Sequence, residues 1–211
     1  MRLLTEKYTE QQERLPDTGK HIAGQFDEEK IIVYQAYKPS IANFAVTNKF
    51  LGGKDYSYTR MTWIKPGFIW MMFRSGWATK ENQERILAIS IGRSHFETIL
   101  KQAVHTSFKP VIYPSGEEWN TAMKQSDVRI QWDPDHYPNG KTLNRRAIQL
   151  GLKGQMAEQF AKKWILDIED ITDFVIEQRK NMDANGIGEL IVPKEDIYTL
   201  SDSALIKQLD L

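Results

Sequence analysis

Five short runs of apolar and alternating side chains predict β-strands. Residues 31–37 are rich in β-branched and aromatic side chains and stop before Pro39, which cannot continue a sheet. Residues 85–91 form a continuous apolar run, as expected of a strand buried on both faces. The other three runs alternate between apolar and polar positions and cover residues 56–64, 128–132 and 146–152. The last two could pair as one hairpin with a long loop.

Apolar positions three and four apart predict helices between these strands. Helices are expected over 40–50, over 66–75 before Gly76, over 94–104, and briefly around Trp119. From Gly154 onward the spacing is helical. The expected fold is therefore α+β, with a mixed or antiparallel sheet and a helical C-terminal third. We expect a polar N-terminal arm over 1–20, one domain over 21–192 and a polar tail over 193–211.

The composition excludes several kinds of site. Lysine plus arginine equals aspartate plus glutamate at 28 each, so no overall charge favours DNA or a membrane. The absence of cysteine excludes disulfides, a cysteine nucleophile and cysteine-bound zinc, and the four histidines have no metal-binding spacing. The longest apolar run, Phe68–Phe73, is too short to cross a bilayer. We therefore expect a cytoplasmic protein with no metal and no membrane partner; the oligomeric state stays open.

The most unusual segment runs from Tyr58 to Lys80 and interleaves three tryptophans with basic side chains. Such a mixture can hold phosphates and stack on bases. Residues 70–73 are also typical of a packed core helix. Three cations, Arg60, Lys65 and Arg74, lie inside otherwise apolar runs, and a buried cation requires a partner. That partner is either a carboxylate of the fold or an anionic ligand.

Two further groups of polar side chains are candidate site residues. If the strands at 128–132 and 146–152 pair, their polar residues share a face. The members of this group are Gln131, Trp132, Asp133, Arg145, Arg146 and Gln149. It could grip a phosphate through its arginine pair, or form a solvated edge. The other group places Gln35 between Tyr34 and Tyr37 in a strand, where it either lines a pocket or lies on a half-exposed face.

Several motifs of this sequence resemble those of a known family. They are VYQAY at 33–37, RMTWIKPGFIWMMFRSGWATK at 60–80, QER at 83–85, VRIQWDPDH at 128–136 and RRAIQLGL at 145–152. Together they resemble the bacterial and fungal family catalogued as domain of unknown function 4291. The resemblance covers residues 20 to 180 and implies no settled activity.

A more distant resemblance is to the ADP-ribosyltransferases. The strand that ends in Val33-Tyr34-Gln35 is similar to their first strand, where an Arg or His holds the ribose of NAD; here the position is Gln35. In that family aromatic side chains stack on nicotinamide and a later Glu steadies an oxocarbenium-like transition state, as in glycoside cleavage. Glu158 is the acid nearest to that place in the chain. The resemblance implies NAD as cofactor, with Gln35 and Glu158 as catalytic residues.

Two functions from different classes follow. In the first, the protein is an enzyme that binds a nucleotide, with NAD as the leading candidate and nucleic acid or protein as the acceptor. The cofactor would contact Tyr34, Tyr37, Arg60, Trp63, Lys65, Arg74 and Trp77, and the acceptor would contact Lys80 and the group from Gln131 to Gln149. In the second, the same side chains form a non-catalytic nucleic-acid-binding groove, extended by Arg129, Arg145 and Arg146.

Overall fold

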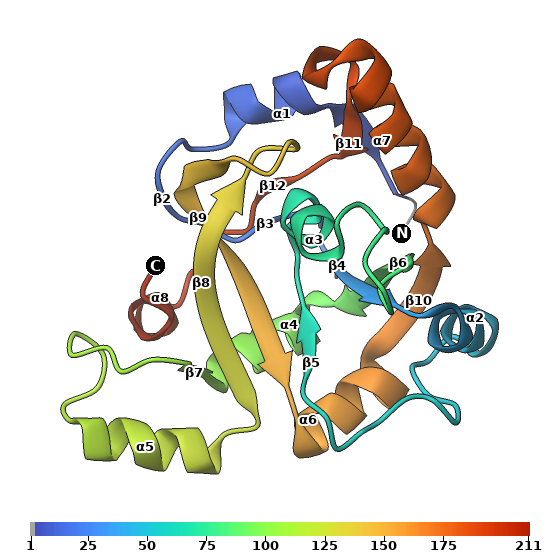
Figure 1. Cartoon of the computed structure of the whole chain (residues 1–211). Helices are drawn as coiled ribbons and strands as arrows, with labels where there is room; N and C mark the ends of the chain where they lie inside the picture. Colours follow the sequence, from blue (N-terminus) through green and yellow to red (C-terminus); the bar gives the residue numbers. More distant parts are fainter. Residues whose placement is uncertain (1–2) are drawn as a thin grey trace.

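A three-stranded antiparallel sheet forms one half of the protein, on the right of the computed structural model in Figure 1, which describes residues 3–211. Its strand order is β10-β6-β4. The central strand is buried because the sheet is covered on both faces, which explains its continuous apolar run. The bounds of these strands are β4 Lys30–Tyr37, β6 Arg85–Gly92 and β10 Ile165–Asp170.

A five-stranded sheet forms the other half. Strands β8 and β9 are its long antiparallel pair, β7 runs parallel to β8, and β5 and β2 both pair with β9. The bounds are β2 Gly19–Lys20, β5 Thr62–Ile64, β7 Ala103–His105, β8 Val128–His136 and β9 Thr142–Leu152. The predicted hairpin between the two long strands is thus confirmed.

The backbones of the two sheets pair at a single isolated bridge. Tyr34 of β4 and Lys65, directly after β5, form an isolated antiparallel bridge with both of its backbone hydrogen bonds, of 2.7 and 3.2 Å. Beyond this bridge β4 and β5 share no further ladder, so the strands separate. This separation is the feature of the fold that makes room for a site.

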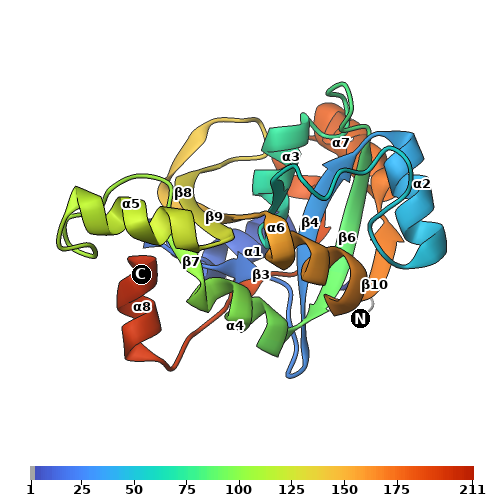
Figure 2. The same ribbon diagram turned by 90° about the horizontal axis from the view of Figure 1, so that it is seen from below.

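The main core lies between the two sheets. Val33 and Ile89 from one sheet meet Ile130 and Leu150 from the other. Helices close this core from outside, as the view from below shows for α4 and α6 (Figure 2). Their bounds are α2 Pro39–Asn48, α4 Arg93–Lys101, α6 Gly154–Gln159 and the π-helix η1 Phe160–Trp164.

A second core covers the opposite face of the three-stranded sheet. Helix α3, Phe68–Ser75, packs Phe68 and Met72 there and ends at Gly76, whose φ of +59° suits glycine. Helix α7, Thr172–Asn185, packs beside it through Val175. Helix α7 therefore helps to fix α3 against β4. The C-terminal end of α3 lies beside the gap between β4 and β5.

Both ends of the described chain are built into the fold. Strand β1 (Thr5–Lys7) pairs with β11 (Ile191–Pro193), and β3 (Ala23–Gly24) pairs with β12 (Asp196–Ile197). The last helix, α8 (Ser203–Leu209), packs Leu205 and Leu209 into the main core. The remaining elements are α1 Tyr8–Arg14, α5 Gly116–Gln125 and the short η2 Ile187–Glu189. Within residues 3–211, no helix combines the length and the apolar character that a bilayer crossing needs.

The predicted α+β class is confirmed, with differences in single elements. The spacing of Ile165, Ile168 and Ile171 predicts a helix, but residues 165–170 form edge strand β10 because β6 offers them a ladder. The predicted strand over 56–64 shortens to three residues, since 56–61 has no strand to pair with. The helix expected to reach Val104 ends at Lys101, and β7 follows. The segments expected as an arm and a tail carry paired strands and packed helices.

Candidate functional site

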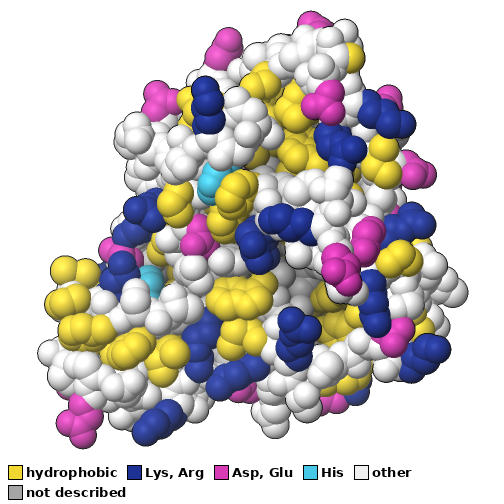
Figure 3. All heavy atoms as spheres, viewed as in Figure 1, with side chains coloured by type: hydrophobic (Ala, Val, Ile, Leu, Met, Phe, Trp, Pro, Cys, Tyr) yellow, Lys and Arg dark blue, Asp and Glu magenta, His cyan; other side chains and the backbone are white. Residues whose placement is uncertain are grey.

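An open cleft of about 630 Å³ lies at the gap between β4 and β5. Strands β4 and β5 and helix α3 form its walls, and the loops at 55–61 and 81–83 form its rim. Figure 3 shows Lys and Arg side chains gathered near the middle of this face, beside the position of α3 in Figure 1. Its basic lining residues are Lys38, Arg60, Lys65 and Arg74. Five of the predicted cofactor-binding side chains thus line one hollow, namely Tyr37, Arg60, Trp63, Lys65 and Arg74.

Gln35 spans the gap at the floor of the cleft. Its Nε2 donates to Thr62 Oγ1 at 2.6 Å and to the carbonyl of Trp63 at 3.1 Å, replacing ladder bonds that the separated strands lack. A carbonyl only accepts, so this contact fixes which end of the amide is nitrogen. Gln35 Oε1 is buried without a hydrogen-bond partner among residues 3–211. Tyr37 completes the group with a 3.0 Å hydrogen bond to Thr62 Oγ1.

Lys65 is the most unusual side chain of the cleft. It is only 5% exposed, yet neither an ion pair nor a hydrogen bond joins its ammonium to any group of residues 3–211. Burial, together with the charge of Arg74, lowers the pKa of Lys65 to about 7, while Asp133 opposes the change. Of the two partners that the sequence left open, no carboxylate of residues 3–211 forms an ion pair with Lys65. The alternative left open by the sequence, an anionic ligand, gains weight.

Arg60, Arg74 and Trp63 surround this lysine with side chains that the fold leaves available. Both arginines are exposed, and no ion pair engages either guanidinium within the described residues. Trp63 is half-buried and its indole lies across Gly151, where an added Cβ would approach it to 3.0 Å. The cleft therefore offers three cations and one aromatic face together.

An oriented carboxylate lies on the same face of the five-stranded sheet. Gln131 and Gln149 are directly opposite each other on β8 and β9. Each donates its Nε2 to Asp133, at 2.7 Å in both cases, so both carboxylate oxygens are held. The predicted sharing of a face is correct for these three residues. The negative charge of Asp133 acts to raise the pKa of Lys65, which links these three polar residues to the cleft.

Three predicted site residues lie in the interior or on the other face of the sheet. Tyr34 is completely buried against Phe68, because alternation along β4 turns it away from Gln35. Trp77 is buried in the same core and donates to the carbonyl of Pro138. Trp132 faces the main core and donates to the carbonyl of Leu209. The structure does not bring these three into the cleft.

Four predicted charged residues are also engaged or placed elsewhere. Lys80 donates to the carbonyls of Phe73 and Arg74 at the end of α3. Arg145 is buried in an ion pair with Asp135, and Arg146 is exposed outside the cleft. Glu158 lies on the surface of α6 and pairs with Lys162, so it is not the cleft carboxylate that the ADP-ribosyltransferase resemblance implies.

The structure also brings into the cleft residues that the sequence did not indicate as site residues, among them Lys38, Asp55, Tyr56 and Glu81. Asp55 forms a 3.3 Å ion pair with Lys38, whereas Glu81 is exposed and has no ion pair among residues 3–211. Asp55 and Glu81 lie in turns outside the alternating runs, so only their closeness to the basic segment could have marked them.

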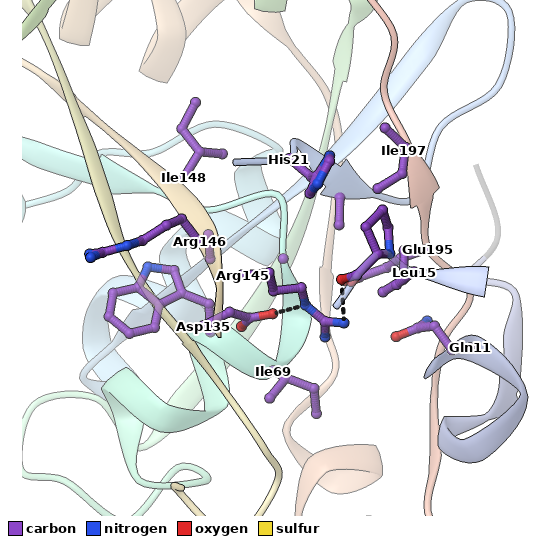
Figure 4. Close-up of a pocket in the computed structure, with 15 residues that line it drawn as sticks. Gln11, Leu15, His21, Ile69, Asp135, Arg145, Arg146, Ile148, Glu195 and Ile197 are labelled. Carbon is purple, nitrogen blue, oxygen red and sulfur yellow. Dashed lines mark hydrogen bonds and ion pairs between the residues drawn. The ribbon is translucent and has the colours of Figure 1, made fainter. Parts of the chain in front are cut away.

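A second, enclosed pocket lies between α1, α3, β9 and β12 (Figure 4). Its volume of about 20 Å³ has room for about one water molecule. Arg145 Nε donates to Asp135 at 2.6 Å across it, and Glu195 accepts from the backbone N–H of Phe68 at the start of α3. Burial raises the pKa of Glu195 to about 8. These groups hold the segment 193–197 against the domain, and the pocket is too small for a nucleotide.

Comparison with known proteins identifies a family without supplying a function. No curated protein matches this sequence. A family model matches residues 21–198, which include every residue of the cleft described above. The chain therefore belongs to the family described as domain of unknown function (DUF4291).

Proposed function

We propose that the cleft binds a nucleotide through its phosphates and that the protein is an enzyme acting on it, with NAD as the leading candidate. The observation that carries this proposal is the partnerless, buried Lys65. Reducing the hydration of an ammonium is costly unless an opposite charge or hydrogen bonds compensate. A phosphate bound beside Lys65 by Arg60 and Arg74 would supply both.

The other lining residues fit the same ligand class. Arg74 and Arg60 are free to bind phosphate oxygens in the two-pronged geometry that guanidinium groups favour. Trp63 offers an aromatic face for a base or a nicotinamide ring. The volume of about 630 Å³ lies within the range of roughly 300–1,000 Å³ that small-molecule sites occupy.

The finer form of the proposal is transfer of ADP-ribose from NAD. That reaction develops positive charge on a ribose carbon and gains from a nearby carboxylate. Glu81 is the cleft carboxylate without an ion pair in the described chain, so we assign it this role in place of Glu158. Gln35 would then hold β5 in place at the floor of the cleft, through its hydrogen bonds to Thr62 and Trp63.

Nucleic-acid binding is the weaker candidate. The groove it requires would extend over Arg129, Arg145 and Arg146. Arg129 donates to backbone carbonyls of Ser126 and Val128, and Arg145 is paired with Asp135, so neither is available to a phosphate backbone.

Thermal unfolding with and without ligand tests the proposal. NAD, ADP-ribose and short single-stranded RNA and DNA are compared at two salt concentrations, using wild type, Arg74→Gln and the control Arg146→Gln, which alters an exposed arginine outside the cleft. We expect NAD or ADP-ribose to raise the melting temperature of wild type and control, and Arg74→Gln to reduce the shift. A shift produced only by nucleic acid and lost at high salt would instead support the binding module.

The proposed transfer of ADP-ribose is tested by a separate measurement of activity. Release of nicotinamide from NAD is expected from wild type and lost in Glu81→Gln, while ADP-ribose still raises the melting temperature of that variant. Equal nicotinamide release by both proteins would remove the role assigned to Glu81.

A further inference from the structure

Lys65 combines three properties that an anion-binding lysine does not need together. It is buried, it lacks a partner within residues 3–211, and it lines a cleft large enough for a small molecule. A lysine that only attracts phosphate functions well when it is exposed and always charged. A lysine that must react as a neutral amine has to lose its proton near neutral pH, and burial beside another cation achieves this.

We propose that Lys65 forms an imine with the carbonyl group of a phosphate-bearing aldehyde or ketone bound in the cleft. The inference rests on the proposed phosphate binding and adds a covalent step to it. Arg74 and Arg60 would hold the phosphate of the ligand, and the carbonyl carbon would lie against the Lys65 nitrogen. A reducing ribose joined to phosphate, as in ADP-ribose, belongs to this ligand class.

The reaction is balanced without any oxidant or reductant. The lone pair of the neutral Lys65 nitrogen attacks the carbonyl carbon, and a proton moves from nitrogen to the former carbonyl oxygen to give a carbinolamine. That hydroxyl then leaves as water as the C–N bond becomes C=N. The amine loses two hydrogens in total, and both depart in the same water molecule as the carbonyl oxygen.

The surroundings of Lys65 favour this step over the same step at a surface lysine. Because the pKa of Lys65 is lowered to about 7, about half of it is neutral at pH 7. An ordinary lysine with a pKa of roughly 10.4 is neutral in only about one molecule in 2,500.

Lys38 supplies a matched control within the same cleft. It lines the rim, its side chain is 37% exposed, and it is paired with Asp55 at 3.3 Å. Its amine is accessible to solvent and already has a carboxylate partner. A reagent that labels lysines by accessibility alone would therefore prefer Lys38 to Lys65.

The test is borohydride trapping followed by site-resolved mass spectrometry of the intact protein and its peptides. The protein at pH 7 is treated with pyridoxal 5′-phosphate, ribose 5-phosphate or ADP-ribose and then reduced. We expect one adduct per chain, heavier by the ligand less one oxygen atom, with Lys65 modified at least tenfold more than Lys38. Inorganic phosphate should compete, and Lys65→Arg should abolish the adduct while Lys38→Met retains it.

The outcomes separate this inference from the proposed function. If ADP-ribose raises the melting temperature but no adduct forms on Lys65, the imine is wrong and nucleotide binding stands. Modification spread evenly over Lys38 and other exposed lysines likewise contradicts the imine. If neither NAD nor any of these three ligands raises the melting temperature and none of the three is trapped, both proposals fail.

Discussion

At the scale of single residues, Lys65 serves ligand binding in the cleft but lowers the stability of the folded protein, because its charge is buried there. Lys65 is charged in the unfolded chain up to pH 10.5 but only up to about 7 in the folded protein. The unfolded state thus binds more protons between these values, and the stability of the wild type should rise with pH across this window as the cost of the buried charge disappears. The charged and titratable groups that act on Lys65 are Arg74 and Asp133.

We therefore predict that Lys65→Met stabilises the protein while it abolishes ligand binding. Methionine has a similar volume and carries no charge, so the free energy of unfolding at pH 7 should increase by about 1–4 kcal/mol. Urea unfolding at pH 7 and at pH 10 measures this, and the gain should shrink at the higher pH. A variant that is less stable than wild type at pH 7 would mean that Lys65 has a counter-charge in solution.

The raised pKa of Glu195 makes the stability of the protein fall as the pH rises, which is opposite in sign to the effect of Lys65. Burial raises its pKa from 4.5 to about 8, with Asp135 and Glu6 adding to the effect and Arg145 and the Phe68 N–H opposing it. The folded state thus keeps a proton that the unfolded state has lost, so this contribution to stability is complete below pH 4.5 and disappears as the pH rises through 8.

Glu195→Gln should remove that dependence, because the amide oxygen can still accept from the Phe68 N–H without ionising. The difference in unfolding free energy between variant and wild type isolates Glu195 from Lys65. We expect it to be near zero at pH 5 and to favour the variant at pH 9. A difference that stays constant from pH 5 to 9 would show that Glu195 has an ordinary pKa.

At the scale of elements, the approach of β5 to β9 orients the aromatic wall of the cleft. Gly151 lies opposite Trp63, and an added Cβ would come to 2.7 Å from Met61 Sδ and 3.0 Å from the indole. The Met61 side chain is long enough to move aside, but the Trp63 indole is a rigid ring, so the added Cβ would displace it as a whole. Gly151→Ala should thus weaken nucleotide binding several-fold with a smaller effect on folding, as measured by isothermal titration with ADP-ribose.

Gly188→Ala is a suitable control for this prediction, because an added Cβ there meets nothing within 4 Å. Unchanged ADP-ribose affinity in Gly151→Ala, with the melting temperature also unchanged, would indicate that Trp63 does not contact the ligand.

The same elements show which parts of the structure could be predicted from sequence. Strand β6 and helix α3 carry their signals locally, in a continuous apolar run and in a glycine stop, and both were predicted. Strand β10 was not, because its pairing with β6 connects residues about 80 positions apart and its isoleucines also fit a helix. For the site, the basic segment at 60–74 was predictable because cations in apolar surroundings are unusual. Its pairing with Gln35 needed the three-dimensional gap between β4 and β5.

At the scale of the whole molecule, the C-terminal helix supports the sheet that carries Asp133. Leu209 is completely buried in the main core, and its carbonyl accepts a 2.8 Å hydrogen bond from Trp132 Nε1. Trp132 adjoins Asp133 on β8 but faces the opposite side. The core contacts of α8 therefore stabilise one face of β8 while the polar group of the site occupies the other.

Leu209→Ala should accordingly lower the free energy of unfolding by about 2–5 kcal/mol, the usual cost of emptying a buried leucine site. Leu166→Ala, at a leucine that is 52% exposed on β10, should change it by less than about 1 kcal/mol. Urea unfolding of both variants measures the difference. If the two costs are equal, α8 does not dock in solution. Leu209→Ala could also lower the free energy of unfolding and leave the affinity for ADP-ribose intact. In that case α8 contributes to stability alone, and pairing with β9 sets the position of β8.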